Sequence, residues 1–163
     1  MLYPRLIELI ESHADEVTAR VLAVVHSDTR LPGMQSLSDT ELVARFDDVC
    51  RRLSQWLTAG ESGGLIERYE ALGRQRCLEG IALYEVVCAG QIFERELIRY
   101  AREQPAEMTA LDLYSEAELE RMIRGFFDRV ILHLVRGYEQ ALREEAGQPA
   151  KRPVVHPLRA VGF

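Results

Sequence analysis

The chain has 163 residues, a length that favours one domain with a hydrophobic core. Hydrophobic residues make up 47% and charged residues 28%, which is ordinary for a globular protein with a water-exposed surface. The net charge of −6 argues against a duplex-DNA binder that relies on a broad basic face. No apolar run approaches the ~18 residues of a membrane span. The start, MLYPRLIELIES, lacks a basic segment followed by an apolar one, so we expect no secretory signal.

The three cysteines give no sign of a disulfide framework or a zinc site. Cys50, Cys77 and Cys88 are far apart in the sequence, and no two have CxxC spacing. They flank apolar helical faces, so we expect buried, unreactive thiols. The sequence therefore predicts no bound metal or cofactor and a reducing, cytoplasmic setting.

Apolar residues recur at steps of three and four almost throughout, which predicts about five amphipathic helices. The first spans residues 4–26 and is followed by a break at Pro32 and Gly33. The second begins at Ser38, which has capping-box spacing to Glu41, and it ends before Gly60.

The second half of the chain contains the longest predicted helix. A third helix is predicted over residues 65–78 and a fourth over 81–103, with Gly80 as a stop or a kink between them. The fifth covers residues 115–145, beginning at a second Ser-x-x-Glu capping box. A helix of this length is expected either to bend or to extend past the bundle to contact a partner.

These elements predict an all-α fold, either a helical bundle or a globin-like packing. Residues 1–146 form one helical domain in this prediction, and residues 147–163 form an irregular, proline-rich tail. In the tail, Lys151, Arg152 and Arg159 alternate with apolar residues. This segment is either a docking peptide for an acidic partner or a flexible terminus.

The common catalytic motifs are missing from the sequence. There is no GxSxG, P-loop, Rossmann glycine pattern, HExxH or EF-hand loop. We therefore predict no catalytic residues and expect a protein that is not an enzyme.

Two histidines lie on apolar helical faces. His13 falls between Ile10 and Val17, and His133 falls between Val130 and Leu134. If the two faces met, the imidazoles could ligate haem iron or another metal. The alternative is that each is a core or boundary residue with a hydrogen-bonded ring.

Arg76 and Glu94 are charged residues on the apolar faces of the third and fourth predicted helices. Unpaired burial of a charge is costly, so the two could form an ion pair. Otherwise Arg76 could meet a small anion in a pocket, or one or both charges could reach solvent. Tyr84 would complete a site if the region were catalytic. Gly90 and Gly137 also fall on buried faces, which indicates close helix crossing or close approach of a ligand.

Three stretches carry a resemblance to a known family. They are IELIESHADEVTARVLA with SDTRLPGMQSLSDTELVARFDDVCRRL, then YEALGRQRCLEGIALYEVVCAGQIFERELIRYA, and last AELERMIRGFFDRVILHLVRGYEQAL. The most telling piece is Gly73-Arg74-Gln75-Arg76, followed by Glu79-Gly80 and a helix that begins Ile81-Ala82-Leu83. Over roughly residues 5–145 the chain resembles the N-terminal domain of RsbRD-type proteins, the RsbT co-antagonist family of bacterial stress signalling.

The resemblance implies a globin-like sensor domain that carries no haem and dimerises. Such domains usually precede an effector, such as a STAS domain or a histidine kinase, and nothing of that length follows Glu145 here. We therefore expect a non-catalytic bacterial signalling or sensor domain in a stress-response or two-component-like pathway. It would be a homodimer that contacts a kinase, a phosphatase or a STAS-type regulator, and would bind neither nucleic acid nor membrane. Two alternatives remain: a globin-like sensor that binds a small ligand or haem, and a small enzyme that uses Arg76, Glu94 and Tyr84.

Overall fold

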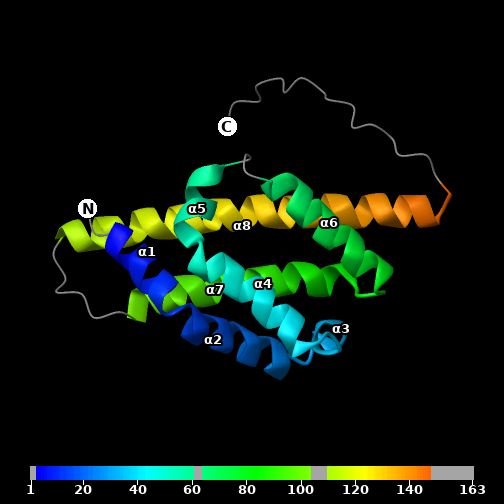
Figure 1. Ribbon diagram of the computed structural model, residues 1–163, viewed down its shortest axis with the longest axis horizontal. Coiled ribbons are helices and arrows are strands. Elements are labelled where there is room, and N and C mark those ends of the chain that lie inside the picture. The colour runs from blue at the N-terminus through cyan, green and yellow to red at the C-terminus, as the bar shows by residue number, and fades with distance from the viewer. Residues whose placement is uncertain (1–2, 61–63, 104–109, 148–163) are drawn as a thin grey trace, which may run out of the picture.

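The computed structural model describes residues 3–60, 64–103 and 110–147 (Figure 1). Within these ranges the chain forms eight α-helices and no strand, so the predicted all-α class is confirmed. The helices are α1 (Tyr3–Ser12), α2 (Ala14–Ser27), α3 (Pro32–Gln35), α4 (Asp39–Arg51), α5 (Leu53–Ala59), α6 (Leu65–Leu78), α7 (Leu83–Glu103) and α8 (Ala110–Glu145).

The helix count differs from the prediction because two predicted helices are each divided at a single residue. His13 separates α1 from α2 with φ −113° and ψ 29°, and Arg52 separates α4 from α5 with φ −120° and ψ 29°. Neither residue is a glycine or a proline, so the sequence carries no breaker signal there. The short helix α3 is an addition in the segment that contains Pro32 and Gly33.

The predicted helix ends were partly right. Ser38 caps α4, because its hydroxyl accepts a hydrogen bond from the Glu41 backbone N–H at 3.2 Å. Gly80 ends α6 with φ 73°, so the stop rather than the kink is confirmed. The capping box predicted at Ser115 was wrong: α8 begins at Ala110, and Ser115 is a buried residue inside it.

Helix α8 is the longest element and runs the length of the bundle, with α6 and α7 packed against it (Figure 1). Its 36 residues correspond to about 54 Å. Its C-terminal end extends beyond the other helices, and residues 142–147 are exposed (Figure 1). The predicted extension past the bundle is therefore present.

The core between these helices is rich in aromatic rings. Phe93 of α7 lies 5.0 Å from Phe46 of α4 and 5.2 Å from Phe127 of α8, measured between ring centroids, and both pairs are edge-to-face. This cluster connects α4, α7 and α8 beside the site described below. No described helix is both long enough and apolar enough to cross a membrane.

Most of the predicted tail, including Lys151, Arg152 and Arg159, lies outside the described residues. The domain boundary near residue 146 and the role of the tail stay predictions.

Candidate functional site

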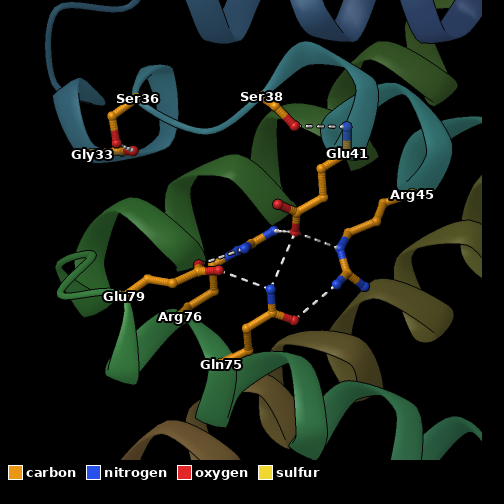
Figure 2. A network of polar contacts seen from close by, with 8 residues as sticks. All are labelled: Gly33, Ser36, Ser38, Glu41, Arg45, Gln75, Arg76 and Glu79. Atoms are coloured by element: carbon orange, nitrogen blue, oxygen red, sulfur yellow. Dashed lines mark hydrogen bonds and ion pairs between the residues drawn. The ribbon is translucent and has the colours of Figure 1, made fainter.

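Among the residues that the structure describes, Arg76 is one of the most buried charged residues, with a side chain that is 3% exposed. It lies in the last turn of α6, where its Nη1 donates to Oε2 of Glu79 at 2.6 Å (Figure 2). Its Nη2 donates to Oε1 of Glu41, on α4, at 2.7 Å. The buried charge of Arg76 is therefore compensated by two carboxylates of the same chain.

Two further side chains close this polar network, as Figure 2 shows. Arg45 donates to Glu41 at 3.2 Å and to the Gln75 amide oxygen at 3.0 Å. The Gln75 amide nitrogen donates to Glu79 at 2.8 Å. The network of Glu41, Arg45, Gln75, Arg76 and Glu79 thus holds two positive and two negative charges.

The network also changes the acidity of Glu41. Burial disfavours its charged form, but the hydrogen bonds and charges of Arg76 and Arg45 outweigh burial, so the pKa of Glu41 is lowered. Glu41 is therefore ionised at neutral pH and tied to both arginines.

A cavity of about 80 Å³ adjoins the network. Its lining comes from α3, α4, α6, α7 and α8 and is mainly apolar, including Leu42, Phe46, Val86, Phe93, Phe127 and Val130. Three arginines also line it: Arg45 and Arg76 of the network, and Arg68, which pairs with Asp48 at 2.7 Å. The cavity therefore combines apolar walls with arginines whose charges are already balanced.

The predicted ion pair between Arg76 and Glu94 was wrong. Glu94 pairs with Arg124 of α8 at 3.1 Å, whereas Arg76 pairs with Glu41 and Glu79. Arg76 is on the part of α6 that faces α4, and Glu94 is on the part of α7 that faces α8. Burial raises the pKa of Glu94, and Arg124 opposes this shift.

The two observed partners of Arg76 differ in whether they could be predicted from the sequence. Glu79 is three residues away on the same helix, a spacing at which side chains meet, so it could have been found. Glu41 comes from a helix 35 residues earlier, and only the packing of α4 on α6 brings it there.

Tyr84 does not join this site. It lies in the first turn of α7 with 60% of its surface exposed, and it is not among the residues that line the cavity. The structure therefore does not bring Arg76, Glu94 and Tyr84 together, which was the premise of the enzyme alternative.

The two histidines are also in different places. His13 is at the α1–α2 junction, where its Nδ1 is 2.9 Å from the Leu9 carbonyl oxygen. His133 is 2% exposed, with its Nδ1 3.4 Å from Oε1 of Glu70 on α6. Neither ring nitrogen of His133 has a hydrogen-bond partner among the described residues, so the expected hydrogen-bonded ring is not observed.

No metal site is formed by these side chains or by others in the described ranges. No group of three or more His, Cys, Asp or Glu residues there is arranged to hold an ion. Neither His13 nor His133 lines the cavity.

For the thiols and the glycines, the structure agrees more closely with the predictions from the sequence. Cys50 and Cys77 are buried, as predicted, and Cys88 is half-buried; burial raises the pKa of Cys50 to about 12. Gly137 marks a close helix crossing, since a Cβ there would lie 2.0 Å from the Glu70 carbonyl oxygen. Gly90 lines the cavity, and a Cβ there would be 3.3 Å from the Ile131 side chain.

A second candidate site is the outer face of α8. Tyr114, Arg121, Gly125, Leu132 and Glu139 follow one another at steps of seven and four residues, so they lie within about 20° of one line along the helix. Tyr114 is 70% exposed and Leu132 is 52% exposed. We call this line the α8 outer face.

The fold and these sites together define an all-α helical bundle with a cavity beside a charge-balanced network. In comparisons with known proteins, no family model matched the chain, and no curated protein or solved structure was similar to it. The resemblance to RsbRD N-terminal domains stays a prediction from the sequence pattern.

Proposed function

We propose that this chain is a non-catalytic regulatory domain that acts through protein contacts and forms a homodimer. The observation that carries the proposal is Gly125 on the α8 outer face. It is inside a helix, where glycine costs about 1 kcal/mol relative to alanine. A Cβ at this position would meet only the end of the Arg129 side chain, at 3.8 Å.

Gly125 thus differs from the glycines of the interior. Gly73 and Gly137 are required by the close contact between α6 and α8, but packing within one chain does not require Gly125. Close approach of a helix from a second copy would explain it, as small residues permit such contacts. The exposed Tyr114 and Leu132 would then be covered by the same contact.

The charges around Gly125 also favour a second copy of the same chain. Arg121, which is 2.6 Å from Glu118 of its own chain, and Asp128 flank the glycine on the exposed side of α8. If two α8 helices crossed antiparallel at Gly125, Arg121 of each copy would lie close to Asp128 of the other. Such a contact is self-complementary, which a twofold dimer requires.

The polar groups of the interior support a non-catalytic role. Arg76, Arg45 and Arg68 are each bound to carboxylates or an amide within the chain. The candidate residues for an enzyme are separated, and a general acid or base must first be within reach of its substrate. A regulatory domain needs no such constellation.

The finer features of the proposal rest on the resemblance to RsbRD domains. They are a globin-like arrangement of the helices, a cytoplasmic location and a bacterial stress-response or two-component-like pathway. The protein partner would be a kinase, a phosphatase or a STAS-type regulator, which receives the signal from this domain.

The cavity favours a small-ligand sensor as a second candidate, but not one that binds haem. A cavity of about 80 Å³ is far smaller than a porphyrin, and no histidine of the described ranges lines it. His133 contacts α6 instead.

The homodimer is tested by size-exclusion chromatography with light scattering. The unmodified chain should have the mass of two 18.6-kDa chains. Leu132→Glu should give a monomer, whereas Leu78→Glu, at an exposed leucine at the end of α6, should leave the dimer intact. A monomeric unmodified chain at all concentrations, or a dimeric Leu132→Glu variant, would refute the proposed interface.

A charge exchange tests the antiparallel arrangement. Arg121→Asp should weaken the dimer, and the double change Arg121→Asp with Asp128→Arg should restore it. If the double variant dissociates as readily as the single one, the helices do not cross at Gly125 in this way.

A further inference from the structure

An open groove runs along α7 on the surface of the bundle. Its volume is about 560 Å³, which is within the range of about 300–1,000 Å³ that binding sites occupy. The lining includes Arg95, Ile98, Arg99 and Arg102 of α7 and Arg124 of α8. We call this surface the α7 groove.

The α7 groove has an excess of positive charge. Its four arginines are opposed by two glutamates in the lining, Glu94 and Glu103. Glu103 is bound to Arg20 of α2 at 2.5 Å, and Glu94 is bound to Arg124 at 3.1 Å. The whole chain has a net charge of −6, so the local sign is opposite to that of the molecule. A negatively charged partner would therefore be attracted to this surface rather than to the rest of the protein.

Arg95 and Arg99 carry hydrogen-bond donors that the chain does not use. Both side chains are more than half exposed, and neither makes a hydrogen bond to another residue in the described ranges. They approach one carboxylate, that of the buried Glu96, at 3.8 and 3.6 Å, which is too long for a hydrogen bond. Arg102, in contrast, donates to Glu120 at 2.6 Å. Two guanidinium groups that share one carboxylate leave one positive charge and several N–H groups for a partner.

The spacing of the arginines can be matched by a second helix. Arg95, Arg99 and Arg102 follow one another at steps of four and three residues, so they lie on one side of α7 over about 10 Å. Ile98 lies among them with little exposed surface. A helix with acidic residues at the same steps would place a carboxylate opposite each arginine, and an adjacent apolar residue would meet Ile98. Carboxylates suit this site because they can form paired hydrogen bonds with a guanidinium group.

From this combination we propose that the α7 groove binds an acidic helical segment of a partner protein. The inference rests on the proposed function and deepens it, because it names the surface through which the regulatory domain contacts its partner. Nucleic acid fits less well, since the net charge of −6 and the two glutamates of the groove repel a long chain of phosphates. The residues that define the α8 outer face do not line the groove, so the site does not require the homodimer.

The proposal is tested by NMR titration of the full chain with a synthetic peptide. The probe is an alanine-rich helix of about 20 residues, with three glutamates at steps of four and three and a leucine next to the middle one. Saturable shifts should centre on the amides of Arg95, Ile98 and Arg99. Exposed ion pairs are individually weak, so we expect a dissociation constant of about 0.1–5 mM at low salt. Shifts that centre elsewhere, or no saturation, would overturn the proposal.

Three further probes test the chemistry of the partner. A peptide with glutamines in place of the glutamates, and one with its glutamates distributed around the helix, should each bind at least about fivefold more weakly. Sodium chloride at about 200 mM should weaken the first peptide to a similar extent, because salt screens exposed charges. Equal binding of either control peptide would contradict the proposal. Tighter binding of a single-stranded oligothymidylate at the same amides would identify nucleic acid as the occupant and overturn it.

Two pairs of substitutions locate the site. Arg95→Ala with Arg99→Ala should weaken peptide binding at least about fivefold. Arg74→Ala with Arg143→Ala removes the same charge from exposed positions on α6 and α8, and should leave the dissociation constant within about twofold. Equal losses would mean that the peptide responds only to net charge, which overturns the site. If the first pair does not fold, Arg95→Ala alone decides, because Arg99 still faces Glu96 in that variant.

The same titration separates the groove from the proposed dimer. The peptide should bind equally well to the Leu132→Glu chain. Loss of the dimer with retained peptide binding would overturn the interface alone, and a dimer that does not bind the peptide would overturn the groove alone. If the variant that lacks Arg95 and Arg99 were monomeric, the groove would hold a second copy of the chain, and the acidic partner would be refuted.

Discussion

The two sides of helix α6 are packed in opposite ways. Toward α8, the backbones touch: a Cβ at Gly73 would lie 2.0 Å from the Leu134 carbonyl oxygen, and one at Gly137 would lie 2.0 Å from that of Glu70. Toward α4, long side chains span the gap, and beside them is the cavity. One helix thus has a backbone-packed side and a side-chain-bridged side.

The difference shows where the bundle can adapt. Two backbones in contact leave no side chain that could move to make room, so the α6–α8 crossing has one arrangement. Arginine and glutamate side chains can rotate, and they can change partners at lower cost. A domain that responds to a ligand or a partner is expected to do so at the bridged side.

The largest effect is expected from a methyl group at the backbone-packed side. Gly137→Ala should lower the free energy of unfolding by about 2–4 kcal/mol, because α6 must move away from α8. Urea unfolding followed by circular dichroism measures this. The control is Gly125→Ala on the same helix, which should raise stability by about 0.5–1 kcal/mol. Both changes are made in the Leu132→Glu background, so that self-association does not contribute.

If Gly137→Ala left stability unchanged or raised it, as Gly125→Ala should, α6 and α8 would be able to separate without cost. The distinction between the two sides of α6 would then be lost.

A smaller effect is expected from the bridged side. Glu41→Gln removes one of the two carboxylates that hold Arg76, and should lower the free energy of unfolding by about 1–3 kcal/mol. Urea unfolding is again the measurement. Glu144→Gln, which breaks an exposed pair with Arg74, is the matched control and should have little effect. If the two variants lost equal free energy of unfolding, the burial of Arg76 would not strengthen its pair with Glu41.

The pH dependence of the free energy of unfolding should reveal the contribution of Glu41. The folded-state pKa of Glu41 is lowered, so its contribution is complete above the pKa of the unfolded chain and is lost as pH falls through the folded value. Between pH 5 and pH 3, the unmodified chain should therefore lose more stability than Glu41→Gln. Asp28, with a pKa of about 2, and Glu144, whose pKa is also lowered, are present in both chains, so the difference isolates Glu41. Parallel curves would contradict the lowered pKa.

The smallest effect is expected at His133. Both ring nitrogens are buried without a hydrogen bond among the described residues, so His133→Leu removes two unsatisfied groups while it loses the contact with Glu70. The stability should change by about 1 kcal/mol or less in thermal or urea unfolding. Glu70 also lies 3.6 Å from Arg136, which can hold it in the variant. A loss above about 3 kcal/mol would show that His133 is a strong partner of α6.

Local signals in the sequence predicted much of the fold. The bounds of α6 were predicted as they are found, and the Ser38 cap and the Gly80 stop were read from residue type and spacing. The breaks at His13 and Arg52 were missed, because a single residue with ordinary φ leaves the apolar period almost unchanged. The start of α8 was placed too late, since Ser115 matches a cap pattern but lies inside the helix.

The sequence by itself determined the all-α class, and it identified Arg76 and Gly137 as candidates for a buried charge and for a close helix crossing. These follow from periodicity, from the cost of burying a charge and from the absence of a Cβ, which are properties of one segment. Only the tertiary structure decided that Arg76 pairs with Glu41 rather than Glu94, that Tyr84 faces solvent, and that a cavity lies between α4, α6, α7 and α8. These depend on which helices meet and at what angle, and such information is spread over the whole chain rather than held in any one helix.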